Sequence, residues 1–475
     1  MTARPVIILS IVLIISVSII IYEQRKAYRI NKIYNFRKEL KRIRISKKNR
    51  NNIKRNAKSL NDSNSTFIGT TSGRKPVRTP DDAKHIFICG TTGSGKTVAL
   101  SNYIKSGVEK NYPMLIIDGK GDTGEGSIYD IVKRLKGKKK LYVVNLTNPI
   151  KSDFYNPFKN ATPTIAKDML INLTEWSEEH YKLNTERHIQ RLLQLLVLRS
   201  RGHNVASGST LSFKSILEHM SVENFVELSG EMQESELITK EEHLNNIGLA
   251  KTSGRIAESA FARFSVIAES ELGYIFNETG VDIYTALKEK AIILFILNPL
   301  IFPETSPLIG RLILIDSKKA LSRLFGNNED RIFFIMDEIN SYASPVLIDL
   351  VNKSRSANIT CILATQSLSD LDYASGDAFK EQLIENCNNY LVMRQNSAVN
   401  AEQWANILGT RATMEVTYQL QQKGLNTSET GFGSARRVRE FLYHPDNIKT
   451  LKPGNGILLS RDSGFHSAVV IVKPF

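Results

Sequence analysis

The chain has 475 residues, of which 41% are hydrophobic and 23% are charged. These are ordinary values for a globular protein, so the composition excludes a collagen-like, intrinsically disordered or disulfide-rich chain. The formal net charge of +15 comes almost entirely from residues 23–58, which hold 15 Lys or Arg and 2 acidic residues. Because the remainder is nearly neutral, broad electrostatic binding of nucleic acid by the whole surface is not indicated.

The three cysteines lie far apart in the sequence, at Cys89, Cys361 and Cys387. No CxxC pair or Cys/His cluster surrounds them, so neither a zinc site nor a disulfide framework is indicated. This cysteine usage suits a reducing compartment such as the cytosol.

Residues 5–22 (PVIILSIVLIISVSIIIY) form an uncharged stretch in which 13 positions are Ile, Leu or Val. As a helix this stretch measures roughly 27 Å, close to the thickness of a bilayer's hydrocarbon core. It runs into EQRK and not into a small-residue cleavage site, which argues against a secretory signal peptide. The sequence therefore predicts an N-terminal transmembrane helix.

Basic residues follow this stretch directly, whereas Arg4 is the one basic side chain before it. Positively charged flanks favour the cytoplasmic side of a membrane. The chain is therefore expected to cross the inner (cell) membrane once, with its C-terminal body in the cytoplasm. Residues 43–65, rich in Lys, Arg, Asn and Ser, read as a solvated linker.

A phosphate-binding loop is predicted where an apolar strand at residues 84–89 meets GTTGSGKT and a following helix. Its glycines let successive amides point at phosphates, Lys96 is expected to reach the β and γ oxygens, and the Thr97 hydroxyl to ligate Mg²⁺. The predicted ATP-binding residues are Gly90, Thr91, Thr92, Gly93, Ser94, Gly95, Lys96 and Thr97.

The matching acidic motif is RIFFIMDE at residues 331–338, an apolar run that ends in two carboxylates. This is how a fully buried parallel strand ends at a ligand site. Asp337 is expected to hold Mg²⁺ through water, and Glu338 to act as the general base that polarises the attacking water.

Two further buried strands are predicted at residues 114–118 and 359–364. The second leads into Gln366, which is a candidate sensor of the γ-phosphate because it follows the end of a strand. Arg355 lies near the end of a predicted helix over residues 345–356. It is either an arginine finger for a neighbouring subunit or a solvated cation favoured by the helix dipole, and the sequence leaves both open.

Residues 156–289 have helical periodicity, most clearly at 186–199 and 254–272, and predict an all-α insertion. A buried strand at 291–297 then restores an alternation of strands and helices that runs to Leu408. The predicted fold is α/β, a RecA-like P-loop NTPase domain with a mostly parallel sheet. Residues 433–475 read as closing turns and hairpin strands.

Taken together, the anchor, GTTGSGKT, IIDGKGD, FFIMDEIN, SRSANITCILATQS and RRVREFLYHPDNIKTLKPGNGILL resemble the type IV coupling proteins, the conjugative-transfer ATPases of the TraG/TraD type. The resemblance implies a homo-hexameric motor that uses ATP and Mg²⁺ at the inner membrane. It also implies as partners a DNA, single-stranded and bound to a relaxase, and the components of a type IV secretion channel. Coupling proteins usually have two membrane helices, whereas one is predicted here.

The expected parts are an anchor at 1–22, a basic linker at 23–65, the first part of the nucleotide-binding domain at 66–160, the all-α insertion at 161–289 and the second part at 290–475. The alternatives are a double-stranded DNA translocase of the FtsK or HerA kind, a secretion ATPase that recruits protein effectors, and a scaffold whose nucleotide site switches assembly.

Overall fold

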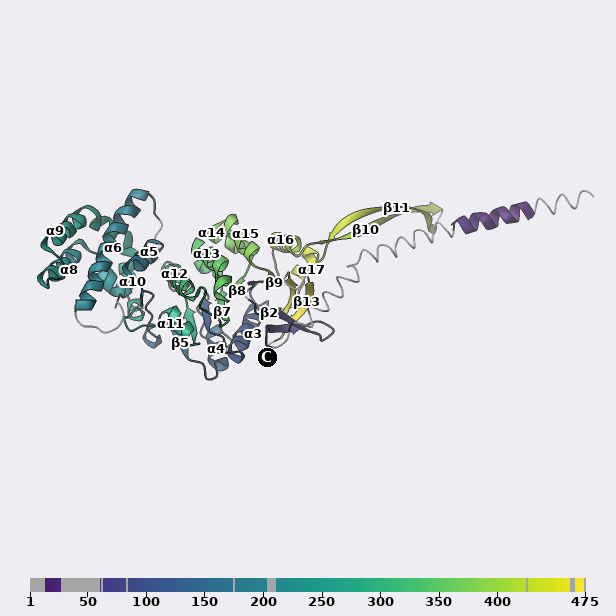
Figure 1. Ribbon diagram of the computed structural model, residues 1–475. Helices are drawn as coiled ribbons and strands as arrows, with labels where there is room; N and C mark the ends of the chain where they lie inside the picture. The colour runs from purple at the N-terminus through teal and green to yellow at the C-terminus, as the bar shows by residue number, and fades with distance from the viewer. Residues whose placement is uncertain are drawn as a thin grey trace, which may run out of the picture. The chain divides into compact units, whose positions relative to one another are not determined.

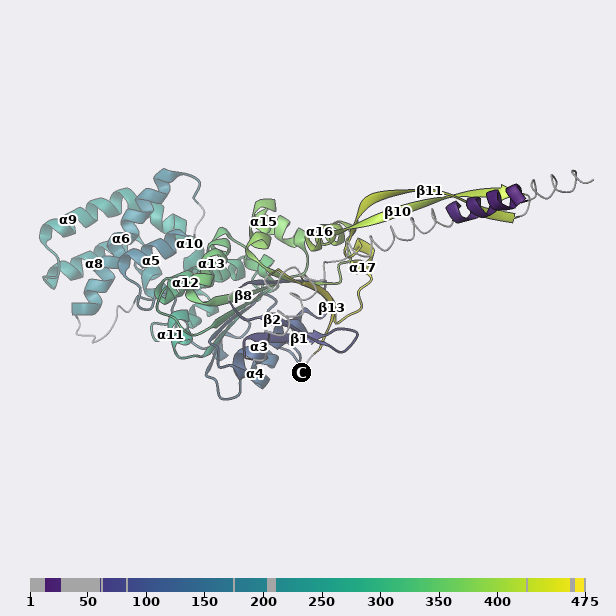
Figure 2. The same ribbon diagram turned by 45° about the vertical axis from the view of Figure 1, so that its right-hand side comes forward.

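The computed structural model describes residues 13–26, 60, 63–82, 84–173, 176–202, 211–423, 426–461 and 466–473. The chain divides into two compact units. The larger unit comprises residues 60–401 and 446–475, and the smaller unit comprises residues 1–59 and 402–445. Figures 1 and 2 show their elements from two directions.

The larger unit is built on an 11-stranded sheet with the order β2-β1-β13-β12-β9-β3-β8-β7-β4-β6-β5. The run of strands from β9 to β5 is parallel throughout. Its bounds are Asn389–Met393 (β9), Ile86–Cys89 (β3), Ile359–Thr365 (β8), Ile332–Asp337 (β7), Met114–Asp118 (β4), Ile292–Ile296 (β6) and Leu141–Asn145 (β5). The predicted RecA-like α/β fold with a mostly parallel sheet is thus confirmed.

Helices cover both faces of the parallel strands (Figures 1 and 2). One face packs on α3 (Lys96–Glu109) and α4 (Ile128–Leu135), where Leu100 and Ile104 of α3 share a buried apolar cluster with the strands. The other face lies under α12 (Thr305–Leu324) and α13 (Pro345–Ser354). Because both faces are covered, every residue of β4, β7 and β8 is buried, which explains their continuous apolar sequences.

Between β5 and β6 the described residues form helices joined by turns and loops, with no strand and one isolated bridge between Tyr155 and Val281. The predicted helical stretches at 186–199 and 254–272 correspond to α6 and α10, which a π-helical turn at Ala250–Gly254 precedes. The helices are α5 (Pro163–Ile171), α6 (Glu179–Gly202), α7 (Phe213–Glu218), α8 (Val222–Glu234), α9 (Lys240–Leu249), α10 (Arg255–Glu269) and α11 (Ile283–Lys288).

Four antiparallel strands extend one edge of the sheet: β2 (Pro76–Pro80), β1 (Ser65–Thr70), β13 (His466–Val472) and β12 (Asn455–Ser460). The sequence predicted hairpin strands over 433–475 but no strands at 65–80. The register pairs Gly69 with Val472. The strand β1 therefore forms through pairing with a segment that lies about 400 residues later in the sequence, which no local pattern can indicate. The predicted hairpin stretch also contains a helix, α17 (Pro445–Lys449), which its apolar pattern did not indicate.

The remaining helices of the second half are α14 (Leu368–Ser375), α15 (Asp377–Asn386) and α16 (Ala398–Leu408). In the smaller unit, β10 (Thr410–Lys423) and β11 (Asn426–Phe441) form a separate antiparallel hairpin. Its register runs from Thr410 opposite Phe441 to Lys423 opposite Asn426. After Leu408 the sequence predicted strands only from residue 433 onwards, so all of β10 and the first part of β11 were missed.

A helix over residues 13–26 belongs to the smaller unit, and all of its side chains are exposed. The predicted anchor begins at residue 5, and its first part, residues 5–12, lies outside the described residues, as does most of the basic linker. Within the described ranges, no helix is both long enough and apolar enough to cross a membrane.

Candidate functional site

The predicted phosphate-binding loop forms the turn between β3 and α3. Gly93 and Gly95 have φ angles of 73° and 110°, a left-handed region in which glycine carries no steric penalty. At Gly90, an added Cβ would lie 2.6 Å from Ser94 Oγ, so the turn is too tight for a side chain there. Gly95 caps α3 without a side-chain hydrogen bond, which leaves the first amides of the helix free for an anion.

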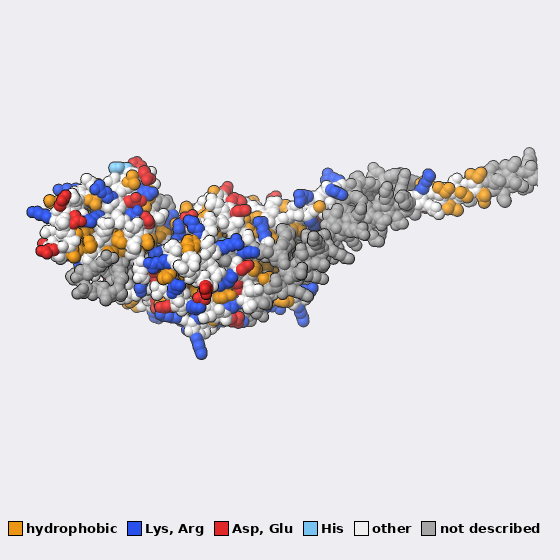
Figure 3. Space-filling view, in the orientation of Figure 1, with side chains coloured by type: hydrophobic (Ala, Val, Ile, Leu, Met, Phe, Trp, Pro, Cys, Tyr) orange, Lys and Arg blue, Asp and Glu red, His pale blue; other side chains and the backbone are white. Residues whose placement is uncertain are grey.

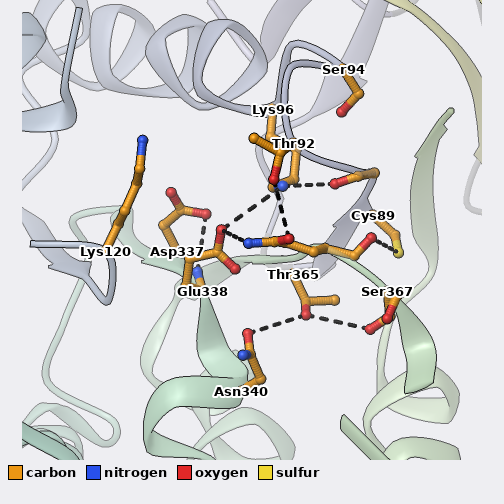
Figure 4. Close-up of polar contacts among 12 residues, drawn as sticks. Cys89, Thr92, Ser94, Lys96, Lys120, Asp337, Glu338, Asn340, Thr365 and Ser367 are labelled. Carbon is orange, nitrogen blue, oxygen red and sulfur yellow. Dashed lines mark hydrogen bonds and ion pairs between the residues drawn. The ribbon is translucent and has the colours of Figure 1, made fainter. Parts of the chain in front are cut away.

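Lys96, the first residue of α3, folds back over this loop and is only 8% exposed. Its Nζ donates to the carbonyl oxygen of Gly90 at 2.7 Å and lies 3.9 Å from Glu338 Oε1 (Figure 4). The strand order places β8 directly between β3 and β7, which brings the loop and the acidic motif to the same edge of the sheet. Lys96 is therefore positioned between the phosphate-binding loop and the acidic motif.

Two buried carboxylates lie side by side at the carboxyl ends of adjacent strands. Asp337 ends β7 and is paired in register with Asp118, which ends β4. Burial raises the pKa of Asp337 to about 7, with further contributions from the charges of Glu338 and Asp118. Burial also raises the pKa of Asp118 to about 6. Asp118 was not among the predicted site residues, although its place at the end of a buried strand was the signal that could have identified it.

These groups fit a magnesium ion. Mg²⁺ prefers carboxylate, hydroxyl and water oxygens, and two crowded carboxylates favour a bound cation. Asp118 and Asp337 could supply the carboxylates of such a site, and Thr97 in the first turn of α3 could supply a hydroxyl.

Glu338 follows β7 in a strained conformation, with a φ angle of 47° and a ψ angle of 51°. Its Oε1 accepts a hydrogen bond from Gln366 Nε2 at 3.0 Å, whereas Oε2 is buried without a hydrogen-bond partner. Gly119 packs closely here, since an added Cβ would be 2.9 Å from the carbonyl oxygens of Asp337 and Glu338. An unpaired carboxylate oxygen held this tightly is suited to accept a proton from a water molecule.

Gln366 directly follows β8 and contacts both motifs. Besides its bond to Glu338, its Oε1 accepts a hydrogen bond from Thr92 Oγ1 at 3.2 Å. Its carbonyl oxygen accepts a bond from Gln395 Nε2 at 3.4 Å. Gln395, just beyond the end of β9, is buried and was missed by the sequence analysis, because nothing in the sequence shows that β9 borders β3.

Arg355 is not brought to this site. It is exposed in a short 3-10 turn, Arg355–Ala357, just before the amino end of β8, whereas Gln366 follows the carboxyl end. A strand of seven residues is about 23 Å long. Within one subunit, Arg355 and Gln366 therefore lie at opposite ends of β8.

Two family models match this chain. The model described as the type IV secretion-system coupling protein DNA-binding domain matches residues 70–126, and the model described as the TraM recognition site of TraD and TraG matches residues 331–453. An uncharacterized protein of Mycoplasma pneumoniae is 31% identical over 105 residues, which cover 22% of this chain and 70% of that protein.

Solved structures share the fold. The bacterial conjugative coupling protein TrwBdeltaN70, in an unbound form, has a TM-score of 0.60 at 17% identity and covers 89% of this chain and 92% of its own. TrwB in complex with ADP and Mg²⁺ has a TM-score of 0.57 at 15% identity, over 86% and 89% of the two chains. VirB4 of Thermoanaerobacter pseudethanolicus has a TM-score of 0.54 at 13% identity, over 87% and 97%.

The two family models therefore fall on the segment that carries Lys96 and on the segment that carries Glu338 and Gln366, which the fold joins into one site. Both models describe parts of type IV secretion-system coupling proteins, and they support the resemblance of this chain to that family.

Proposed function

We propose that this protein is a membrane-anchored ATPase that couples ATP hydrolysis to the delivery of DNA, a relaxase-bound single strand, into a type IV secretion channel. The observation that carries the proposal is the contact between Glu338 and the phosphate-binding loop through Lys96 and Gln366. A general base held next to a phosphate site is the arrangement that hydrolysis of a terminal phosphate needs.

The residues of the site divide the work. The amides at the start of α3 and the Lys96 ammonium would hold the phosphates. Asp337, Asp118 and Thr97 would hold a magnesium ion, whose positive charge would stabilise negative charge on the phosphate oxygens. Glu338 accepts the proton of the attacking water, and Gln366 donates to the terminal phosphate. Gln366 is the proposed sensor of the γ-phosphate because its hydrogen bond to Glu338 connects the phosphate site with the general base.

DNA is proposed as the substrate because one family model describes a coupling-protein DNA-binding domain. The face of the larger unit in Figure 3 shows Lys and Arg interspersed with Asp and Glu, with no continuous basic surface. Binding by a few residues that line a ring is compatible with such a surface, whereas wrapping of duplex DNA needs many phosphate contacts. A homo-hexamer is part of the proposal, with Arg355 exposed for a neighbouring subunit.

The test of this function is the ATPase rate of the purified protein, with and without single-stranded DNA, at two salt concentrations. Stimulation by single-stranded DNA that weakens with salt is expected. Stimulation by duplex DNA alone would favour the FtsK or HerA alternative. A rate that responds only to a protein substrate would favour the secretion ATPase that recruits protein effectors. Absence of ATP hydrolysis would favour the scaffold whose nucleotide site switches assembly.

The anchor is proposed from the sequence of residues 5–22 and the basic residues that follow. A reporter fused after Phe475 should be active in the cytoplasm. Deletion of residues 1–22 should release most of the protein from membranes, and high salt should release the remainder that the basic segment retains. A reporter active only outside the cytoplasm would contradict the orientation.

A further inference from the structure

A chain of three side-chain contacts connects the phosphate-binding loop to the general base. Thr92 Oγ1 donates to Gln366 Oε1 at 3.2 Å, and Gln366 Nε2 donates to Glu338 Oε1 at 3.0 Å (Figure 4). Lys96 Nζ approaches the same carboxylate oxygen to 3.9 Å. Gln366 is thus held at both ends of its amide, although 274 positions separate it from Thr92.

The two ends of this amide are chemically different. The ionised carboxylate of Glu338 can only accept hydrogen bonds, so it requires the NH₂ end of Gln366. A threonine hydroxyl can donate, and Thr92 accordingly meets the oxygen end. With the Thr92 hydroxyl absent, one of these two side-chain contacts is lost, and Glu338 alone would hold the amide of Gln366.

We propose that Thr92 is a positioning residue for hydrolysis: its hydroxyl holds the oxygen end of the Gln366 amide in place, so that the NH₂ end stays against Glu338 and the space of the terminal phosphate. This inference rests on the proposed ATPase function.

The surroundings of Gln366 separate this role from general support of the turn. The backbone of Gln366 is held by other groups, since its carbonyl oxygen accepts bonds from Gln395 Nε2 at 3.4 Å and from Cys89 Sγ at 3.6 Å. The hydroxyl of Thr92 therefore controls the side chain and not the path of the main chain. Thr92 is itself exposed, so its replacement by valine leaves the packed core untouched.

The experiment compares Thr92→Val, Thr92→Ser and wild-type full-length protein by steady-state ATP hydrolysis and by binding of a fluorescent ADP. Loss of one hydrogen bond should lower kcat roughly two- to tenfold in Thr92→Val, and Thr92→Ser should restore the wild-type rate. The dissociation constant of ADP should stay within about twofold, since the variant keeps the backbone amides of the loop and the Lys96 ammonium that are proposed to bind phosphate. Thr252→Val is the control, because that hydroxyl bonds to carbonyl oxygens of its own helical segment.

A double-mutant cycle with Gln366→Ala decides the mechanism. If Thr92 acts through Gln366, Thr92→Val should cause no further loss of kcat in the Gln366→Ala protein. Losses that multiply, a Thr92→Val protein at the wild-type rate, or ADP binding weakened as much as kcat would each overturn the inference while the ATPase function stands. A wild-type protein without ATPase activity would instead overturn the proposed function and this inference with it.

Discussion

Glu338 combines three features that are unusual for a carboxylate. It is 8% exposed, its backbone lies in the left-handed region with a φ angle of 47°, and one of its oxygens has no hydrogen-bond partner. A non-glycine residue in that conformation costs on the order of 1–3 kcal/mol, which the surrounding packing must offset. Such strain is typical of residues whose position serves catalysis.

Replacing Glu338 by glutamine should separate binding from hydrolysis. Glutamine has the same shape but cannot accept the proton of the attacking water, so turnover should fall by roughly 10²- to 10⁴-fold while ATP still binds. Lys96→Ala should abolish both, because the phosphates lose their cation. Fluorescent-ATP binding and phosphate release measure the two effects. Glu329→Gln, at an exposed position, is the control; wild-type turnover in Glu338→Gln would refute the role of the base.

The residues of this site were predictable from the sequence where they are contiguous. The loop at 90–97 and the pair Asp337–Glu338 can each be recognised from one short sequence motif. Asp118 and Gln395 do not, because their place in the site depends on which strands become neighbours. The contact of Thr92 with Gln366 likewise needs β3 beside β8, and no local pattern carries that information.

Among the elements, the parallel strands β3, β4, β6, β7 and β8 were recognisable as apolar runs because helices cover them on both sides. The strands at the antiparallel edge were harder to predict. Their register joins segments near opposite ends of the chain, so tertiary pairing and not intrinsic preference fixes their structure.

A buried ionic cluster connects α12 with the segments that enter and leave the helices between β5 and β6. Lys319 Nζ lies 2.8 Å from Asp316 Oδ1 and 3.4 Å from Asp282 Oδ2, and it donates to the carbonyl oxygen of Pro157 at 2.6 Å. The hydroxyl of Tyr155 donates to Asp316 at 2.9 Å. Burial raises the pKa of Asp316, and the positive charge of Lys319 opposes this rise.

Lys319→Met should therefore destabilise the larger unit by about 3–5 kcal/mol, because two carboxylates would remain in the core without a cation. Lys318→Met is a matched control on the neighbouring residue. Lys318 pairs with Asp349 at 2.8 Å on the surface, and a pair of that kind contributes less than about 1 kcal/mol. Urea unfolding of the two variants measures the difference, and equal losses would contradict this account of the cluster.

The packing of α6 against α8 predicts a dependence of stability on pH. His188 of α6 is fully buried, with its ring centroid 4.5 Å from that of Phe225, and burial lowers its pKa to about 4. Between pH 6.5 and 4 the unfolded chain binds this proton and the folded chain does not, so stability falls as the pH falls. The loss between pH 7 and pH 5 should be about 2 kcal/mol.

Urea midpoints at pH 7 and pH 5 check this dependence. In His188→Phe the decrease between the two pH values should be smaller by that amount, whereas substitution of His180, exposed on the same helix, should leave the decrease unchanged. An identical pH dependence in His188→Phe and wild-type protein would show that His188 is not responsible.

For the whole molecule, the unresolved choice between two roles of Arg355 becomes a question about assembly. The side chain is exposed at the amino end of β8 and cannot serve the site at the other end of the same strand. It can serve hydrolysis only if another subunit presents its nucleotide there. The alternative is a cation that stabilises the end of α13, a role worth about 0.3–1 kcal/mol.

These roles differ in the rate that Arg355→Ala retains. A finger that neutralises charge in the transition state contributes roughly 10³- to 10⁵-fold in rate, so the variant should lose nearly all turnover. Lys353→Ala, an exposed cation in the last turn of the same helix, should hydrolyse ATP normally. Near-normal turnover of Arg355→Ala would select the structural role.

Mixing of variants then tests whether the arginine acts between subunits. Arg355→Ala subunits have an intact Lys96, and Lys96→Ala subunits have an intact Arg355. In the proposed ring, some interfaces of a mixture would join a functional phosphate-binding loop to a functional arginine, so partial activity should return even where each variant alone is inactive. Activity measured over a series of mixing ratios should pass through a maximum at intermediate composition. A series without such a maximum would contradict catalysis at an interface between independently acting subunits.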